Sequence, residues 1–230
     1  MIDKSCLLIG NSRWHWAFNT NAGWDFIHTQ PNPQKLLQLE RHIFNWAAVG
    51  KIPKNVNLDP NKNINIQHIP FKNLPEWLGI DRALGAWGAS LRANQIGLND
   101  KYLLVADAGT IFSLTRIKNM ELFAGGQLVP GMKLQLEAMA RGAKNLKNPG
   151  INQSFVETYP FSTNAAMQKG SFQAILGTIL EAQRDTKAPI WLCGGDSGLF
   201  IQELKNHHLK VFHCPDLVLE GMINIQSKLN

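Results

Sequence analysis

A run of three strands joined by short turns and followed by a helix is predicted twice in this chain of 230 residues. The first copy starts near residue 5 and turns at Gly10, and the second starts near residue 102 and turns at Gly109. After the first turn, Trp14, Trp16 and Phe18 alternate with other residues, which is the two-residue period of a β-strand. A strand that turns directly into another strand excludes the strand–turn–helix of a Rossmann or P-loop unit. The repeat predicts an α/β fold of two lobes, each a mixed sheet that opens with a three-strand meander and is flanked by helices.

Hydrophobic periodicity along the chain predicts elements that fit this repeat. Strands are expected over residues 7–9, 13–18, 24–29, 43–49, 64–69, 102–107, 111–116, 121–129, 189–192 and 210–213, and helices over 31–42, 82–93, 130–146, 163–184, 197–206 and 217–228. Residues 51–63, rich in Lys, Asn, Asp and Pro, are expected to form a surface loop. The lobes are predicted to span residues 1–101 and 102–230, with the option that the last helix packs back on the first lobe.

The composition is that of a globular protein suited to anionic ligands. The chain is 44% hydrophobic and 17% charged, with a formal net charge of +6, which favours ligands such as nucleotides. Its Lys and Arg residues are scattered and form no basic run interleaved with aromatic residues, so no nucleic-acid partner is expected. No apolar stretch approaches the roughly 20 residues that span a bilayer, and the N-terminal apolar run is too short for a signal peptide. A cytoplasmic protein with no membrane contact is expected. The three cysteines have no paired spacing and are expected to be buried and reduced.

The first glycine turn has the residue types of a phosphate-binding loop. Gly10 permits a tight turn, and the side chains of Asn11 and Ser12 can donate hydrogen bonds. Arg13 and His15 lie two residues apart on the strand that leaves the turn, so both can reach the same anion. The alternative is an ordinary β-hairpin turn.

The second glycine turn repeats this arrangement and adds an acid. Asp107 ends a predicted strand, where its carboxylate can hold a cation, and Gly109 and Thr110 offer backbone amides and a hydroxyl to phosphate. A simple capped turn is the alternative. Because the same arrangement recurs at equivalent points of two similar meanders, we favour two phosphate-binding turns.

The acid–arginine pair at residues 81 and 82 has the residue types of a site for phosphoryl transfer to an alcohol. Such a reaction needs an acceptor for the hydroxyl proton, and Asp81 is the best placed general base. Arg82 offers a planar fork to a carboxylate or phosphate. The alternative is an acid at the N-cap or in the first turn of the following helix, with a surface arginine beside it.

Six short stretches, taken in order, resemble motifs of the type III pantothenate kinase family. They are residues 9–12 (Ile-Gly-Asn-Ser), 78–82 (Leu-Gly-Ile-Asp-Arg), 107–110 (Asp-Ala-Gly-Thr), 125–131 (Gly-Gly-Gln-Leu-Val-Pro-Gly), 163–170 (Thr-Asn-Ala-Ala-Met-Gln-Lys-Gly) and 215–221 (Pro-Asp-Leu-Val-Leu-Glu-Gly). Each is short, but six in order over nearly the whole chain are hard to obtain by chance. The resemblance implies two actin-like (ribonuclease H-like) lobes and ATP-dependent phosphorylation of pantothenate to 4′-phosphopantothenate, the first step of coenzyme A biosynthesis.

This resemblance also implies how the acceptor substrate is bound. Asp81 would be the catalytic base toward the primary hydroxyl of pantothenate. The implied pantothenate-binding residues are Gly79, Ile80, Asp81, Arg82 and Thr163. The family works as a homodimer in which the second lobes contribute to a shared interface and acceptor site, so a homodimer is implied here.

For the nucleotide and its metal ions, the resemblance points to the two glycine turns. Asp107 would bind the monovalent cation, potassium or ammonium, that the family requires. ATP and magnesium would meet the residues around both turns. The implied nucleotide-binding residues are Gly10, Asn11, Ser12, Arg13, His15, Gly109 and Thr110.

Three positions depart from the family pattern. The family's first motif carries Asp two residues before its glycine, and this chain has Leu8 there, so a carboxylate that helps to organise magnesium is missing. The lysine usually found shortly after that motif is here His15, a weaker and pH-dependent cation. A tyrosine that usually precedes the acid–arginine motif has no obvious counterpart, although Phe71 and Lys72 lie in its neighbourhood.

Two other functions remain open from the sequence. The Leu8 change is of the kind that a retired kinase would carry, which leaves a non-catalytic transcriptional regulator on the same scaffold. A kinase for another small alcohol is also open, because Arg82 would accept any substrate that bears a carboxylate. We favour an active kinase, because Asp81, Arg82, Asp107 and Thr110 are all present.

Overall fold

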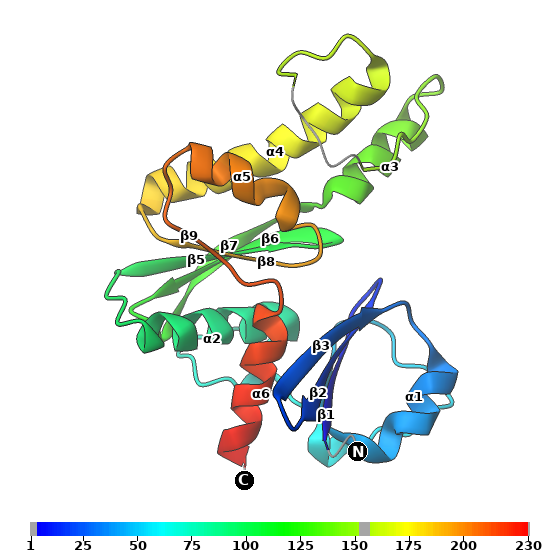
Figure 1. Ribbon diagram of the computed structural model, residues 1–230, viewed down its shortest axis with the longest axis vertical. Coiled ribbons are helices and arrows are strands. Elements are labelled where there is room, and N and C mark those ends of the chain that lie inside the picture. Colours follow the sequence, from blue (N-terminus) through cyan, green and yellow to red (C-terminus); the bar gives the residue numbers. More distant parts are fainter. Residues whose placement is uncertain (1–3, 152–156, 230) are drawn as a thin grey trace. The chain divides into compact units, whose positions relative to one another are not determined.

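The computed structural model describes residues 4–151 and 157–229. The helices and strands follow the predicted order closely (Figure 1). The strands are β1 (Ser5–Ile9), β2 (Trp14–Thr20), β3 (Gly23–Thr29), β4 (Ile43–Ala48), β5 (Tyr102–Ala108), β6 (Ile111–Lys118), β7 (Leu122–Pro130), β8 (Ile190–Cys193) and β9 (Val211–His213). The α-helices are α1 (Pro33–Leu39), α2 (Ile80–Gln95), α3 (Met132–Gly142), α4 (Thr163–Thr186), α5 (Gly198–Asn206) and α6 (Leu217–Leu229).

The chain forms two compact units. The first contains the residues up to Asn99, the tip of the β6–β7 hairpin (117–123) and the segment from Asp216 onward; the second contains 100–116 and 124–215. Their first boundary lies close to the expected one at residue 101. The hairpin tip and α6 group with the first unit instead of with the rest of residues 102–230.

The first unit is built on a four-stranded sheet with the order β3-β2-β1-β4. β1 runs antiparallel to β2 and parallel to β4. One face of this sheet forms a core with α1, because alternate strand residues point to the same side. This core contains Leu7, Ile9, Trp14, Trp16, Phe18, Leu36, Ile43, Trp46 and Leu58. The opposite face carries Leu8 and His15, which are direct neighbours in the β1–β2 register, and α6 contacts both of these strands.

Helices α2 and α6 cross closely at two glycines. A Cβ added at Gly221 would overlap the carbonyl oxygen of Leu84, and one added at Gly88 would overlap the carbonyl oxygen of Leu217. The two backbones therefore touch without intervening side chains, and this is the physical use of the glycine that closes the 215–221 motif.

Replacing Gly221 with alanine should destabilise the first unit. The added methyl forces the α2 and α6 backbones apart, and overpacking of this kind costs about 1–3 kcal/mol. Chemical denaturation monitored by circular dichroism measures the change in the free energy of unfolding. Gly170→Ala in α4 is the control, because a Cβ there meets nothing within 4 Å and alanine is the better helix former by about 1 kcal/mol. Equal stability of Gly221→Ala and the natural chain would contradict the close crossing.

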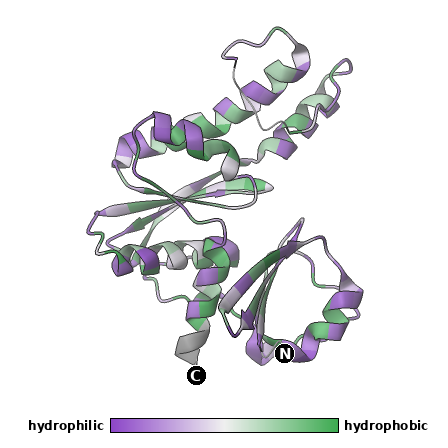
Figure 2. Ribbon diagram, in the orientation of Figure 1, coloured by the Kyte–Doolittle hydropathy of each residue, from purple (hydrophilic) through white to green (hydrophobic). Residues whose placement is uncertain are grey.

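The second unit is built on a five-stranded sheet with the order β7-β6-β5-β8-β9. β5 pairs in parallel with β8, and β8 in parallel with β9. Helices α4 and α5 pack on one face of this sheet (Figure 1), and Figure 2 shows hydrophilic and hydrophobic residues alternating around both helices, as expected for helices that bury one side. The core between them includes Ala106, Phe112, Leu114, Phe172, Ile175, Ile179, Leu192, Phe200 and Leu204.

The structure corrects the expected strand over residues 64–69. Ile64 donates one backbone hydrogen bond to Trp46, and the following residues form a short 3₁₀-helix, Ile66–His68. The side chain of Asn65 accepts from the N–H of Gln67, and Nδ1 of His68 accepts from the N–H of Asn65. Local side-chain bonds of this kind compete with strand pairing.

Smaller expectations about helix bounds and cysteines are also resolved. The helix expected over 31–42 is α1 followed by a 3₁₀ turn, Glu40–His42, and the helix expected over 130–146 ends at Gly142. Cys6, Cys193 and Cys214 are buried thiols, as predicted. Across the described residues, no helix has the length and apolarity needed to cross a membrane.

Candidate active site

Asp81 lies in the first turn of α2, two residues after the N-cap residue Gly79. The backbone N–H of Arg82 donates a hydrogen bond of 2.8 Å to Oδ1 of Asp81. Burial raises the pKa of Asp81, and this effect exceeds the opposing one of the Arg82 N–H and guanidinium. Burial also lowers the pKa of Arg82, against the effect of the Asp81 charge. A carboxylate whose proton affinity is raised in this way is better suited to take a proton from an alcohol.

Gly79 leaves the space that the Asp81 carboxylate occupies. A Cβ at position 79 would lie 2.6 Å from Oδ1 of Asp81, which is too close for two non-bonded atoms. The glycine of this motif therefore fixes where the acid can sit.

A pocket of about 390 Å³ adjoins the start of α2 within the first unit. It is lined by residues 78–80, by the 63–66 segment and by Ala48 and Val49 at the end of β4. Its volume is in the range of small-molecule sites. The segment 63–66, which ends at the first residue of the 3₁₀ turn, therefore supplies one wall of this pocket.

In the first glycine turn, Gly10 is needed because a larger residue would not fit, and its backbone N–H is not free to bind a ligand. Its N–H donates to the carbonyl oxygen of Arg13 at 3.0 Å, and a Cβ there would lie 2.6 Å from the same oxygen. Gly50, just after β4, donates its N–H to Ile9 at 2.9 Å, and a Cβ on Gly50 would overlap the carbonyl oxygen of Gly10. Sequence reasoning missed Gly50; its only signal was a glycine directly after a strand.

The second glycine turn is held by two distant segments. The N–H of Gly131 donates to Thr110 O at 3.0 Å, and the N–H of Asp196 donates to Ala108 O at 2.9 Å. A Cβ at Gly131 would overlap the carbonyl oxygen of Gly109. The structure thus brings the 107–110 and 125–131 motifs together around one turn, with residues 194–196 beside them.

Asp107 lies near the end of β5, against the backbone of Gly194. A Cβ on Gly194 would overlap Oδ1 of Asp107 and lie 2.6 Å from Ala108 O. Gly194 also has φ +89°, a conformation that other residues rarely adopt. The glycine is therefore required twice, for its backbone conformation and for the space that it leaves to the acid.

The two turns are equivalent in their own sheets. β4 pairs in parallel with β1, as β8 does with β5. A glycine just after each partner strand, Gly50 or Gly194, approaches a carbonyl oxygen of the turn beside it. The internal repeat predicted from the sequence therefore extends to the residues that support each turn.

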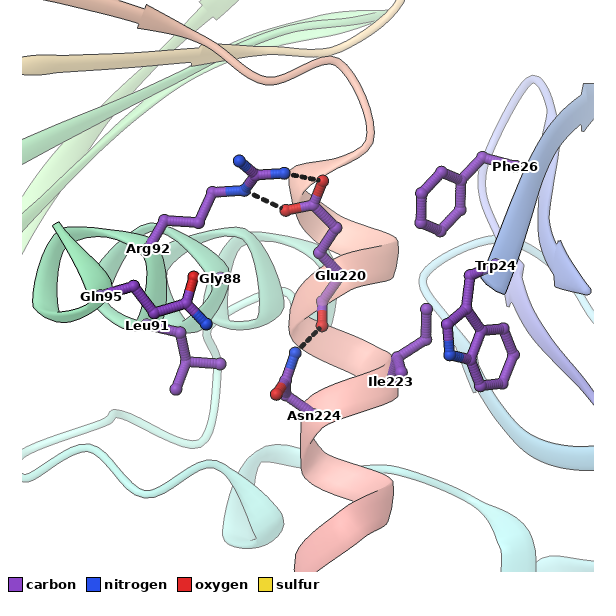
Figure 3. A pocket seen from close by; sticks show the side chains of 9 residues that line it. All are labelled: Trp24, Phe26, Gly88, Leu91, Arg92, Gln95, Glu220, Ile223 and Asn224. Atoms are coloured by element: carbon purple, nitrogen blue, oxygen red, sulfur yellow. Dashed lines mark hydrogen bonds and ion pairs between the residues drawn. The ribbon is translucent and has the colours of Figure 1, made fainter. Parts of the chain in front are cut away.

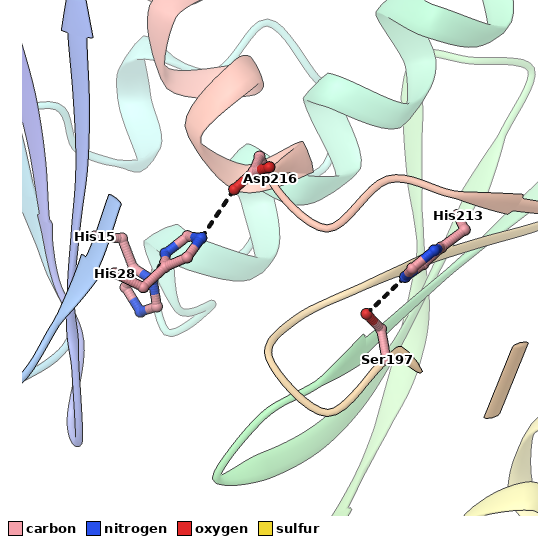
Figure 4. A network of polar contacts seen from close by, with 5 residues as sticks. All are labelled: His15, His28, Ser197, His213 and Asp216. Carbon is pink, nitrogen blue, oxygen red and sulfur yellow. Dashed lines mark hydrogen bonds and ion pairs between the residues drawn. The ribbon is translucent and has the colours of Figure 1, made fainter. Parts of the chain in front are cut away.

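His15 is not a free cation beside the first turn. Its Nδ1 lies 2.7 Å from Nδ1 of His28, whose Nε2 lies 2.9 Å from Oδ1 of Asp216 (Figure 4). Burial, with smaller effects from His28 and Arg13, lowers the pKa of His15 to about 4. Without a ligand, His15 is therefore neutral at pH 7, unlike the lysine that the family usually has here.

A magnesium site in this chain would depend on the nucleotide. No three His, Cys, Asp or Glu side chains gather to hold a metal ion within residues 4–151 and 157–229. Leu8, at the position of the family's acid, is 4% exposed, and its side chain has no oxygen. Magnesium is commonly held by one or two carboxylates together with substrate phosphates, and Asp107 beside the second turn fits that arrangement.

The two residues in the neighbourhood of the missing tyrosine differ in their exposure. Phe71 is buried and packs edge-to-face on Trp87, with ring centroids 5.8 Å apart. Nζ of Lys72 lies 3.1 Å from Oε1 of Glu121, and the backbone of Lys72 pairs with the β6–β7 hairpin. Phe71 is therefore part of the core of the first unit, whereas the Lys72 side chain is 69% exposed.

Thr163 begins α4 and is exposed. The side chain of Ser162, the N-cap, accepts a hydrogen bond from Ala165 N at 3.3 Å. Thr163 belongs to the second unit, whereas Asp81 belongs to the first.

A second pocket in the first unit, of about 310 Å³, was not anticipated from the sequence (Figure 3). Trp24 and Phe26 of β3 face α2 and α6 across it. On its wall, Arg92 of α2 forms two hydrogen bonds of 2.5 and 2.6 Å with the carboxylate of Glu220 on α6. This bidentate pair adds a polar link to the close crossing of the two helices.

The two sheets, each opening with a meander and a glycine turn, define the fold class of actin-like ATPases and sugar kinases. A protein from Campylobacter jejuni assigned to the Baf family of transcriptional activators aligns with a TM-score of 0.62 at 19% identity, covering 98% of both chains. A Sinorhizobium meliloti protein assigned as 2-dehydro-3-deoxygalactonokinase aligns with a TM-score of 0.59 at 11% identity, covering 98% of this chain and 96% of the other. At these identities the similarity establishes the fold alone.

Sequence comparison identifies the family within this class. The family model of type III pantothenate kinase matches residues 58–185. The type III pantothenate kinase of Synechococcus elongatus is 27% identical over 243 residues, which cover 96% of this chain and 95% of that relative. This chain belongs to the type III pantothenate kinase family, as the six motifs indicated.

Proposed function

We propose that this protein transfers the γ-phosphate of ATP to the primary hydroxyl of pantothenate, forming 4′-phosphopantothenate and ADP. The observation that carries the proposal is the placement of Asp81. It is a partly buried acid with a raised pKa, in the first turn of α2 and next to a pocket of small-molecule size. Membership of the family supplies the identity of the acceptor.

In the proposed reaction, Asp81 accepts the hydroxyl proton of pantothenate as its oxygen attacks the γ-phosphorus. The bond between that phosphorus and the β–γ bridging oxygen breaks, and ADP leaves with the bond's electron pair. Arg82 pairs with the substrate carboxylate, Thr163 contributes to its binding, and Gly79 and Ile80 form the backbone beside it.

The nucleotide phosphates bind at the two glycine turns. Because the Gly10 N–H is used within its own turn, Asn11, Ser12 and Arg13 supply the donors there, and Gly109 and Thr110 supply them at the second turn. Magnesium would be held by the phosphates with Asp107 beside the second turn, and it would supply neutralisation of charge on the transferred group. A monovalent cation, potassium or ammonium, is a further proposed requirement at Asp107.

We also infer a cytoplasmic homodimer. Tyr159 and Phe161, just before Thr163, are exposed at 88% and 103%. Exposed aromatic side chains at neighbouring positions favour a protein contact, and the family resemblance favours a second copy of this chain as the partner. Sedimentation at several protein concentrations tests the homodimer.

The test of the proposed function is the reaction itself. Purified protein is incubated with ATP, magnesium, pantothenate and either potassium or sodium, and the product is identified by mass spectrometry. Formation of 4′-phosphopantothenate supports the proposal, and dependence on potassium supports the monovalent cation. Folded protein that binds ATP but forms no product would favour the alternative, a non-catalytic regulator or a kinase for another acceptor. The observation that favours a non-catalytic regulator is Leu8, because it replaces the acid that the family has at this position.

Replacing Gly79 with alanine should lower turnover by moving the base. The new Cβ would lie 2.6 Å from Oδ1 of Asp81, and a shift of about 1 Å in a reacting group can cost about a hundredfold. Steady-state kinetics with pantothenate should show the loss in kcat, while the dissociation constant for ATP stays unchanged. A Gly79→Ala variant with normal kcat would show that the carboxylate is not held in the position described.

A further inference from the structure

A chain of three titratable side chains links the first glycine turn to the start of α6. His15 and His28 are directly opposite each other on β2 and β3, and Asp216, 188 residues from His28, closes the chain (Figure 4). The other edge of the His15 ring faces the turn, because a Cβ added at Gly10 would lie 3.3 Å from its Nε2.

The hydrogen bonds fix which nitrogen of each ring carries a proton. An ionised carboxylate only accepts, so His28 donates from Nε2 to Asp216. In a neutral chain, Nδ1 of His28 then accepts from Nδ1–H of His15, which leaves a lone pair on His15 Nε2 beside the turn. One proton added to the pair replaces the lone pair on His15 Nε2 with an N–H group. Whether the positive charge rests on His15 or on His28, the His15 nitrogen that faces the turn then carries a hydrogen.

We propose that the His15–His28 pair takes up one proton from solvent when nucleotide phosphates bind at the Gly10 turn, and that His15 Nε2 then donates a hydrogen bond to them. The inference rests on the proposed function, because it takes this turn to be a phosphate site. His28 and Asp216 are positioning residues, since they act on the phosphate only through His15.

The surrounding charges explain why the proton enters with the ligand. Burial, followed by smaller effects of His28 and of the Arg13 charge, disfavours a protonated His15 in the free protein, where its pKa is about 4. The Asp216 carboxylate at the far end of the chain favours positive charge on the pair. Two or more phosphate charges at the near end add to this effect and raise the pKa of His15 in the complex.

Among the described residues of the neighbouring elements, α6 offers one further acid and β1 offers an apolar residue. Glu220, one turn after Asp216 on α6, is held by Arg92. β1 presents Leu8 opposite His15, so this strand brings no charge. The two departures from the family's first motif are therefore one cross-strand pair. The permanent positive charge of the family's lysine is thereby replaced by His15, whose Nε2 can donate a hydrogen bond only after the pair has taken up a proton.

Linkage gives the sign of the pH effect. If the complex holds one proton more than the free protein, nucleotide affinity falls as pH rises through the pKa of the complex, by up to about tenfold per pH unit above it. A lysine at position 15 would be charged in both states, so it would remove this dependence.

The test is isothermal titration calorimetry with ADP and magnesium, near pH 6, in buffers of different ionisation enthalpy. The dependence of the measured heat on the buffer gives the number of protons taken up. We expect the natural chain to take up about 0.3–1 proton more than His15→Lys or His15→Gln. Equal uptake in the natural chain and in both folded variants would overturn the proposal.

Two further variants test whether the charge of Asp216 promotes proton uptake, apart from its structural role at the start of α6. Asp216→Asn keeps a residue type that caps helices well but removes the balancing charge, so proton uptake should fall. Asp25→Asn, an exposed acid on β3, is the matched control and should leave the uptake unchanged. Proton uptake by Asp216→Asn equal to that of the natural chain would exclude Asp216 from the proposed role.

Kinetics and NMR provide independent readouts. The KM for ATP should rise with pH in the natural chain and stay flat in His15→Lys, with kcat unaffected by this difference. Nitrogen-15 spectra of the free protein should show the proton on Nδ1 of His15 and on Nε2 of His28; the opposite tautomers would contradict the scheme. ADP binding without extra proton uptake overturns this inference alone, whereas failure of ADP to bind overturns the proposed function as well.

Discussion

Asp81→Asn is expected to lower kcat for pantothenate phosphorylation by about 10²–10⁴-fold, the usual contribution of a general base. Asparagine keeps the size of the side chain and the oxygen that accepts from Arg82 N, so the start of α2 should be preserved. The dissociation constant for ATP, measured by calorimetry, should therefore change little. Near-normal turnover would remove Asp81 from the role of base.

The same substitution should not destabilise the fold. Because burial raises the pKa of Asp81, the folded state holds its proton more tightly than the unfolded state does. The ionised carboxylate therefore costs stability, and this cost develops as pH rises above the unfolded pKa and through the folded one. At pH 7, Asp81→Asn should melt at the same temperature as the natural chain or higher. Asp25→Asn serves as the control and should leave both kcat and melting temperature unchanged.

Gly131→Ala is expected to impair nucleotide use through the second turn. A Cβ there would overlap the Gly109 carbonyl oxygen and lie 2.8 Å from Thr110 O, so the turn must shift. We expect kcat/KM for ATP to fall on the order of a hundredfold, the effect of displacing a binding group by about 1 Å. Steady-state kinetics at varied ATP concentration measure this loss.

The control for Gly131→Ala lies on the following helix. Gly142 ends α3, and a Cβ there meets nothing within 4 Å, so Gly142→Ala should retain full activity. If Gly131→Ala folds and keeps the kcat/KM of the natural chain, the second turn does not bind the nucleotide in the way we propose.

Local sequence patterns predicted most of the fold. The two-residue and 3.6-residue periods are properties of the chain itself, so strands such as β2 and helices such as α2 were placed within a few residues of their observed bounds. The strand expected over 64–69 was wrong because side chains of Asn65 and His68 bond to nearby backbone groups. The hydrophobicity pattern of a sequence does not reveal hydrogen bonds between side chains and nearby backbone groups.

The sequence by itself determined the residue types of the site, because each motif is short and contiguous. Asp81 with Gly79, and Asp107 with its turn, could be read without knowing what packs beside them. Only the tertiary structure decided what those residues meet. Gly194 lies against Asp107 because β5 and β8 pair in parallel. His15 is neutral because the fold buries it and β3 brings His28 beside it, and both effects lower its pKa. Strand register and helix packing join residues far apart in the chain, and the charge of a side chain depends on those neighbours.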